Sequence, residues 1–159
     1  MKIFRKNLLY VRALLFLIYE SVYYLYVMKI QSREILIQED YVKDPWKMMV
    51  CCILLNQTNN KQVRPILSSV FELIPDPISA SGVDVKVLAE IIKTTGFQNV
   101  KATRIKSLSQ KWSDGFSDVA ELPGIGRYGK DSWEIFINGR RDISPTDRKL
   151  IKYLEDITF

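Results

Sequence analysis

Residues 122–126, which read L-P-G-I-G, point most directly to chemistry by their types and spacing. Gly124 and Gly126 stand one residue apart, directly before a run in which apolar residues recur at helical spacing. A tight turn at the start of a helix directs backbone N–H groups outward, beside the positive end of the helix dipole. That arrangement suits an anion, most simply a phosphate group, so we expect a phosphate-binding hairpin here. An ordinary glycine turn is the alternative.

A longer stretch around this hairpin resembles a known protein family. Residues 124–132 read G-I-G-R-Y-G-K-D-S, and residues 144–153 read S-P-T-D-R-K-L-I-K-Y. These strings are similar to the second half of the helix-hairpin-helix, and to the Gly/Pro-rich loop with its aspartate, in base-excision DNA glycosylases of the HhH-GPD superfamily. Within it they most resemble the glycosylase domain of the methyl-CpG-binding mismatch thymine/uracil glycosylases. The resemblance covers residues 31–159, the expected glycosylase domain.

The resemblance implies a set of site residues. The catalytic carboxylate of the family corresponds to Asp147. The residues that form the pocket for the extruded base correspond to Tyr128, Gln38 and Ile37. The residues that enter the duplex correspond to Gln57, Asn56 and Phe97. The hairpin that binds DNA phosphates corresponds to Gly124, Ile125, Gly126 and Arg127.

The chemistry of the family assigns a specific task to Asp147. An enzyme that acts on a base within a duplex must extrude it and read it in a pocket. Cleavage of the N-glycosidic bond leaves positive charge on the sugar, and a nearby carboxylate stabilises that charge or activates water. The sequence leaves these two roles open. It also leaves open a structural role, since an aspartate at a helix start caps the amides of Lys149 or Leu150.

The other positions also have plainer interpretations. Gln38 carries an amide that suits the edge of a pyrimidine, but an exposed helix glutamine is the alternative. Phe97 is the candidate wedge between bases, and a core phenylalanine is its alternative. Gln57 lies where the family fills the hole left by the flipped nucleotide, and Thr58 or Asn59 can cap the next helix without conflict.

Tyr128 distinguishes two classes within the family. Bifunctional relatives have a lysine at this position, and its amine forms a Schiff base with the sugar that leads to strand cleavage. A phenol does not form that bond, and neither Lys130 nor Lys149 occupies the lysine position. The resemblance therefore implies a monofunctional DNA N-glycosylase without AP lyase activity.

The composition excludes several other chemistries. The chain has 159 residues, 47% of them hydrophobic, which suits one domain with a core, and its formal charge of +5 favours a polyanionic partner. It has no histidine, which excludes Ser-His-Asp and Cys-His catalysis and most histidine metal sites. Cys51 and Cys52 are adjacent in an apolar run, which favours buried thiols and offers no four-cysteine iron–sulfur site. We expect no metal and no cofactor.

Residues 1–30 lie outside the resemblance and form a hydrophobic N-terminal extension. Positions 9–27 are apolar and aromatic over the length of a membrane span. Arg12 and Glu20 interrupt this stretch, and each costs a few kcal/mol near a bilayer centre by rough insertion scales. We expect an extra helix. A membrane anchor and a misassigned gene start, with Met28 as the true one, are the alternatives.

Apolar residues recur at helical spacing along most of the chain, and no run alternates convincingly with period two. The expected helices are 33–40 capped by Ser32, 45–55 opened by Asp44-Pro45, 61–73, 85–94 capped by Asp84, 99–112, 116–122, 127–138 and a last one opened by residues 146–147. Lys101, Arg104 and Lys106 are expected on a solvated or phosphate-binding face. This helical spacing predicts an all-α chain. The resemblance implies a helix-hairpin-helix DNA glycosylase fold with two helical lobes around a cleft, Asp147 at its floor and no iron–sulfur cluster.

The resemblance implies a glycosylase that flips out a thymine or uracil opposite guanine and hydrolyses its N-glycosidic bond. Its expected partner is double-stranded DNA with a mismatched or damaged base. We expect a monomer that acts in the nucleus, or in the nucleoid if the source is prokaryotic. The alternatives are a helix-hairpin-helix module that only holds DNA, a membrane-tethered protein, and a copy that has lost its activity.

Overall fold

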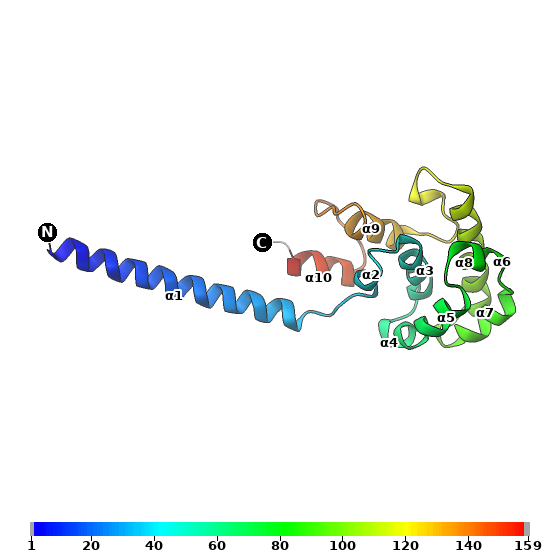
Figure 1. Cartoon of the computed structure of the whole chain (residues 1–159), viewed down its shortest axis with the longest axis horizontal. Helices are drawn as coiled ribbons and strands as arrows, with labels where there is room; N and C mark the ends of the chain where they lie inside the picture. Colours follow the sequence, from blue (N-terminus) through cyan, green and yellow to red (C-terminus); the bar gives the residue numbers. More distant parts are fainter. Residues whose placement is uncertain (1, 158–159) are drawn as a thin grey trace. The chain divides into compact units, whose positions relative to one another are not determined.

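The computed structural model describes residues 2–157, with side chains described in that range except at residues 2–10, 13, 30 and 32. Within this range the chain forms α-helices and short 3-10 helices and no β-strand (Figure 1). The α-helices are α1 (Lys2–Ser32), α2 (Ile37–Asp40), α3 (Pro45–Leu55), α4 (Asn60–Val63), α5 (Leu67–Leu73), α6 (Pro77–Gly82), α7 (Val85–Ile91), α8 (Gln98–Asp114), α9 (Arg127–Phe136) and α10 (Arg148–Ile157). The 3-10 helices are η1 (Arg64–Ile66), η2 (Lys93–Thr95) and η3 (Val119–Glu121). The prediction of an all-helical chain is confirmed.

The chain divides into two compact units. One contains the residues up to Glu34 together with those from Tyr153 onward, and the other is Ile35–Lys152. Every candidate site residue falls in the second unit. That unit therefore contains everything that the site argument needs.

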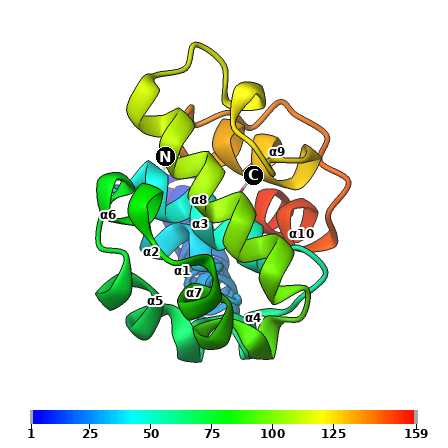
Figure 2. The ribbon, with the colours of Figure 1, turned by 90° about the vertical axis from the view of Figure 1, so that its right-hand side faces the viewer.

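Helix α3 is the centre of the second unit. The Asp44 side chain caps it by accepting a hydrogen bond from Lys47 N, and Pro45 occupies the first helical position, where its missing N–H costs nothing. Its residues from Met48 to Leu55 are all buried, and α2, α4, α8 and α9 pack around it (Figure 2). The prediction of a buried central helix is confirmed, and so is the burial of Cys51 and Cys52.

Helix α8 packs against α3, α6 and α7. The Trp46 indole N–H donates to Ser109 Oγ at 3.0 Å, so a buried polar bond joins α3 to α8. The polar face predicted for this helix is wrong in part. Lys101 was expected on that face but is only 2% exposed, because its ammonium finds acceptors inside the fold. Val100 beside it is 48% exposed.

The element before the hairpin differs from the prediction. Residues 116–122 were expected to form the first helix of the motif, but the structure has only the 3-10 turn η3 there. The Glu121 side chain accepts hydrogen bonds from Ser117 N and Asp118 N, and Asp118 accepts one from Ala120 N. These bonds form a capping box that starts the turn at Val119, and the extended backbone of Leu122 before Pro123 ends it, so the turn stays short.

Several predicted boundaries are corrected by local causes. Ser32 ends α1 instead of capping residues 33–40, and α2 starts only at Ile37. The helix expected over 61–73 is divided into α4, η1 and α5 around Pro65, which has no N–H to donate. The helix expected over 85–94 ends at Ile91 and continues as η2, although the Asp84 cap is confirmed.

Helix α6 was missed altogether. It starts with the same signal as α3, an aspartate followed by proline: Asp76 accepts from Ser79 N at 2.8 Å, and Pro77 is the first helical residue. An aspartate followed by proline therefore predicts the start of α6 as well as that of α3.

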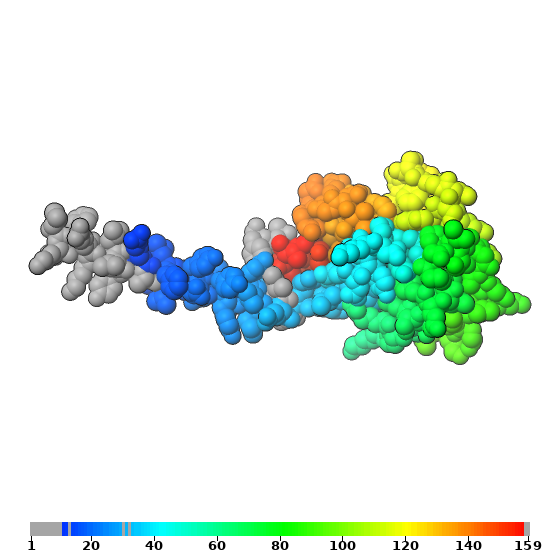
Figure 3. All heavy atoms as spheres, in the orientation of Figure 1, coloured from blue at the N-terminus to red at the C-terminus, as the bar shows by residue number. Residues whose placement is uncertain are grey.

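The first unit consists of α1 and the end of the chain. Lys29 Nζ lies 3.7 Å from Asp156 Oδ1, and Arg33 lies over the Tyr153 ring at 5.1 Å. Large apolar side chains of α1 are exposed, including Phe16. The described atoms of this helix are the blue spheres in Figure 3. In the part of the chain that the structure describes, no helix combines the length and hydrophobicity that a bilayer crossing requires. The roles proposed for residues 1–30 stay predictions.

Candidate active site

A buried hydrogen-bond cluster joins α2 to α9. The Gln38 side-chain amide donates one hydrogen bond to the Tyr128 hydroxyl and another to Ser132 Oγ at 3.3 Å. Gln38 is 1% exposed, so it is not the exposed helix residue of the plainer interpretation. Both amide protons are used, and in the described part of the chain nothing donates to Gln38 Oε1. The cluster therefore keeps a carbonyl oxygen and the Tyr128 hydroxyl proton for a further partner.

The surroundings keep Tyr128 neutral. Burial raises the pKa of its phenol, the nearby Cys52 and Asp147 raise it further, and the hydrogen bond from Gln38 lowers it in part. The phenol is therefore protonated at any physiological pH. The charge of Asp147 contributes to the raised pKa of Tyr128, so the two predicted site residues lie in the same region of the fold.

Ser132 and Ile37 complete this region. Ser132 is fully buried, accepts a hydrogen bond from the Gln38 amide and lies near the Cys52 thiol, so it connects α9 to both α2 and α3. Ser132 was not predicted from the sequence, although it stands four residues after Tyr128 and therefore on the same helix face. Ile37 has no exposed surface and belongs to the main hydrophobic core, so its role in a base pocket stays a prediction.

Asp147 opens α10. Its Oδ1 accepts hydrogen bonds from Lys149 N at 2.9 Å and Leu150 N at 3.1 Å, which confirms the predicted N-cap. The side chain is half-buried. Within the described residues, no donor reaches the second oxygen, Oδ2. One oxygen thus fixes the carboxylate and the other is available for chemistry.

The hairpin glycines have different needs. Gly124 has φ +82°, and a Cβ there would lie 2.9 Å from Arg104 Cβ, so both its conformation and its close approach to α8 require glycine. Gly126 has φ −87° and nothing within 4 Å of a Cβ, so the free protein does not require glycine there. Ile125 is buried, so it anchors the hairpin in the core.

The helix that follows the hairpin begins without a side-chain cap at Gly126, so its first amides are not satisfied by a side chain. Arg127 is exposed, and its Nη2 donates to Ser144 O at 3.1 Å while its Nε lies 3.6 Å from Asp131 Oδ2. Arg127 thereby ties the hairpin helix to the loop that leads to Asp147. Its predicted phosphate contact is not tested.

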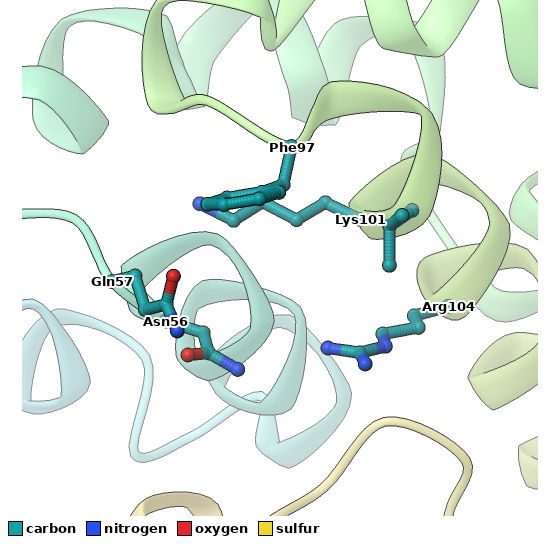
Figure 4. A pocket seen from close by; sticks show the side chains of 6 residues that line it. Asn56, Gln57, Phe97, Lys101 and Arg104 are labelled. Carbon is teal, nitrogen blue, oxygen red and sulfur yellow. The ribbon is translucent and has the colours of Figure 1, made fainter.

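Two loops of the second unit meet at a hollow lined by Asn56, Gln57, Phe97, Val100, Lys101 and Arg104 (Figure 4). Phe97 is 65% exposed, which rules out the core phenylalanine of the plainer interpretation. Asn56 and Gln57 are exposed as well. The Asn59 side chain caps α4 by accepting from Gln62 N, so a cap and a surface Gln57 occur together, as predicted. Asp147 does not line this hollow, and the cleft with Asp147 at its floor stays a prediction.

The cysteines and acidic residues offer no metal site among the side chains that the structure describes, where no group of three or more His, Cys, Asp or Glu could hold an ion. Burial raises the pKa of the Cys51 thiol, and it raises the pKa of Cys52 to about 12, so neither thiol ionises at neutral pH.

The family follows from a comparison with known proteins. Residues 50–158 match the HhH-GPD superfamily base excision DNA repair proteins, and the chain belongs to this family. The matched region contains both the glycine hairpin, whose helix has no side-chain cap, and the helix α10, which Asp147 caps.

The chain is also similar to individual proteins of known name. The chain is 36% identical over 120 residues to a methyl-CpG-binding domain protein 4-like protein from Arabidopsis thaliana, which covers 74% of this chain and 27% of that protein. It is 28% identical over 123 residues to a thymine/uracil-DNA glycosylase from Pyrobaculum aerophilum, which covers 72% of this chain and 53% of that protein. The chain thus spans about a quarter and about half of these two relatives.

A solved structure supports the fold. The structure of a thermostable thymine-DNA glycosylase superimposes with a TM-score of 0.55 and 22% sequence identity, over 62% of this chain and 49% of that one. The predicted all-α glycosylase fold is confirmed at this level.

Proposed function

We propose that this protein is a monofunctional DNA glycosylase that flips a thymine or uracil out of a mismatch with guanine and hydrolyses its N-glycosidic bond. The observation that carries the proposal is the buried cluster of Gln38, Tyr128 and Ser132, with the charge of Asp147 close to Tyr128. The names of the two relatives, a methyl-CpG-binding domain protein 4-like protein and a thymine/uracil-DNA glycosylase, support the same substrate class.

The hydrogen-bond directions in the cluster suit a uracil or thymine edge. Because Gln38 spends both amide protons on Tyr128 and Ser132, its carbonyl oxygen accepts and the Tyr128 hydroxyl donates. The edge of these bases has one N–H donor flanked by two carbonyl acceptors. The Gln38 carbonyl oxygen can accept from the N–H of the base while the Tyr128 hydroxyl donates to a carbonyl oxygen next to that N–H.

Asp147 supplies the charge for bond cleavage. Positive charge develops on the sugar as the base leaves, and a carboxylate held by two backbone amides opposes it without having to reorganise. The free Oδ2 faces no competing donor among the described residues. Tyr128 forms no imine with the sugar, so the product is an intact abasic site.

The exposed loops and the hairpin act on the duplex. Phe97 wedges between bases, while Gln57 and Asn56 fill the space that the extruded nucleotide leaves. Gly124, Ile125, Gly126 and Arg127 hold the phosphate backbone and position the protein without reading sequence. The enzyme acts as a monomer, in the nucleus or in a prokaryotic nucleoid.

Incubation with duplexes that each carry one lesion tests the proposal. Uracil or thymine opposite guanine should be released, with strand cleavage only after alkali. Borohydride should trap no protein–DNA adduct. A trapped adduct would show that an amine such as Lys130 or Lys149 forms the imine, and the monofunctional assignment would fall. Binding without release of any base would favour the module that only holds DNA.

A further inference from the structure

The two duplex-facing loops share an unusual backbone feature. Gln57 has φ +53° and Phe97 has φ +49°, and within the residues that the structure describes these are the two non-glycine residues with positive φ. Side chains in this left-handed region persist only where the surrounding structure holds them. Something in the fold must therefore hold both loops in place.

Lys101 lies between the two loops. Its ammonium donates to Leu54 O at 2.8 Å, at the end of α3 just before Asn56 and Gln57, and to Thr95 O at 2.8 Å, just before Phe97. Its third hydrogen bond reaches Thr58 Oγ1 at 2.6 Å, directly after Gln57. Figure 4 shows the side chain extended from α8 toward these loops.

The contacts satisfy the whole ammonium group. Its three protons have three acceptors, and Thr58 Oγ1 also lies 2.8 Å from Thr95 O, to which it donates. Burial lowers the pKa of Lys101 to about 8, so the protonated form with all three donors still prevails at pH 7. A cation buried to this degree is unusual unless every donor is used.

We propose that Lys101 is a positioning residue that ties the Gln57 loop to the Phe97 loop, so that both side chains enter the duplex as one unit with a fixed spacing. This inference rests on the proposed function, because it assigns Lys101 a part in extruding the base. It predicts that loss of Lys101 weakens base extrusion more than it weakens DNA binding.

The test replaces Lys101 by methionine, which keeps the length of the side chain and removes the charge. Lys111→Met is the matched control: Lys111 is near the other end of the same helix, and its Nζ lies 3.2 Å from Glu121 Oε2. The measurements are thermal unfolding, affinity for undamaged duplex, single-turnover base release from a G·U duplex, and fluorescence of 2-aminopurine beside the uracil.

Lys101→Met should slow base release roughly 10- to 100-fold and reduce the 2-aminopurine signal, because a displacement of about 1 Å is enough to disturb the insertion. Affinity for undamaged duplex, which depends on phosphate contacts, should change less than about threefold. Phe97→Ala added to Lys101→Met should cause little further loss, since residues that act as one unit are not additive. Lys111→Met should leave base release and fluorescence unchanged.

Thr58→Val keeps the test decisive if Lys101→Met fails to fold. It is nearly isosteric and removes one acceptor of Lys101 and the bridge to Thr95 O, so it should reproduce the loss of fluorescence in weaker form. Normal release and fluorescence in a folded Lys101→Met or Thr58→Val protein would overturn the role of Lys101 and leave the proposed function intact. Wild-type protein that releases no base from any lesion would instead overturn the proposed function, and the role of Lys101 with it.

Discussion

Around Tyr128 the polar side chains are buried and hydrogen-bonded to one another. By contrast, Gln57 and Phe97 have exposed side chains and a backbone held in the left-handed region. The base-pocket cluster, Gln38, Tyr128 and Ser132, is thus ordered by burial. The duplex-facing loops, which carry Gln57 and Phe97, are held by hydrogen bonds from the buried Lys101 ammonium to their backbone carbonyls.

Because of this difference, the base-pocket cluster and the duplex-facing loops should respond differently to substitution. Removing a partner in the base-pocket cluster leaves a buried polar group unsatisfied, so folding and function suffer together. Removing an exposed loop side chain deletes little buried surface, so function suffers and folding does not. The following substitutions test this contrast, starting with the largest expected effect.

Asp147→Asn should reduce the single-turnover rate of base release by roughly a thousandfold or more, because it removes the charge that opposes the developing cation. Asparagine also caps helices, so the unfolding temperature and the affinity for DNA should remain. Asp84→Asn makes the same change at the cap of α7 and should leave the rate untouched. An Asp147→Asn protein with full activity would leave the DNA-binding module as the better interpretation.

Tyr128→Phe should slow base release roughly 10- to 100-fold, because the pocket loses the group that pairs with the base. The Gln38 amide loses its acceptor, so the free energy of unfolding should fall by about 1–3 kcal/mol in denaturant titrations. Tyr41→Phe is the control, since Tyr41 packs on Phe71 outside the site. If Tyr128→Phe leaves both quantities at wild-type values, the base-pocket cluster is not the reading site.

Phe97→Ala should lower base release about tenfold with no loss of stability beyond about 0.5 kcal/mol, because the ring is 65% exposed. Ile78→Ala removes a side chain that is 77% exposed on α6, and neither property should change. A loss of several kcal/mol on Phe97→Ala, as for a core phenylalanine, would contradict the contrast drawn here.

Gly126→Ala should have the smallest effect. Folding should be unchanged because the site has an ordinary φ and open space, while affinity for every duplex should fall only a few-fold, by rough estimate, as the methyl group keeps a phosphate away. Gly124→Ala provides the comparison: it should destabilise the protein, because the φ of +82° disfavours alanine and the added Cβ would lie too close to Arg104. Equal affinities for wild type and Gly126→Ala would show that this part of the hairpin does not touch DNA.

Local signals predicted much of the fold. The Asp44-Pro45 start of α3 and the Asp147 cap of α10 were readable because caps depend on neighbours in the sequence. The burial of Lys101 was not, because its acceptors Leu54 O and Thr95 O come from other parts of the chain. A pattern of polar and apolar residues places a lysine on the surface unless tertiary contacts are known.

The candidate site was predictable as a set of residues but not as a geometry. Gln38 and Tyr128 were singled out by resemblance alone, and only the structure brings them into contact across 90 positions. The missing helix over 116–122 had another cause, because the capping box of Asp118 and Glu121 starts the turn only at Val119 and the backbone of Leu122 before Pro123 is extended. The catalytic and DNA-binding roles of these residues remain predictions for the experiments above.

The left-handed backbone at Gln57 implies a conflict between the stability of the protein and the proposed role of this side chain. A non-glycine residue in this region costs about 1–2 kcal/mol, and glycine at the same position would avoid that cost. Selection for heat resistance alone would therefore favour Gln57→Gly and would discard the side chain proposed to fill the duplex. Engineering that ranks variants by melting temperature would reward this loss, so a screen of this protein should score base release alongside stability.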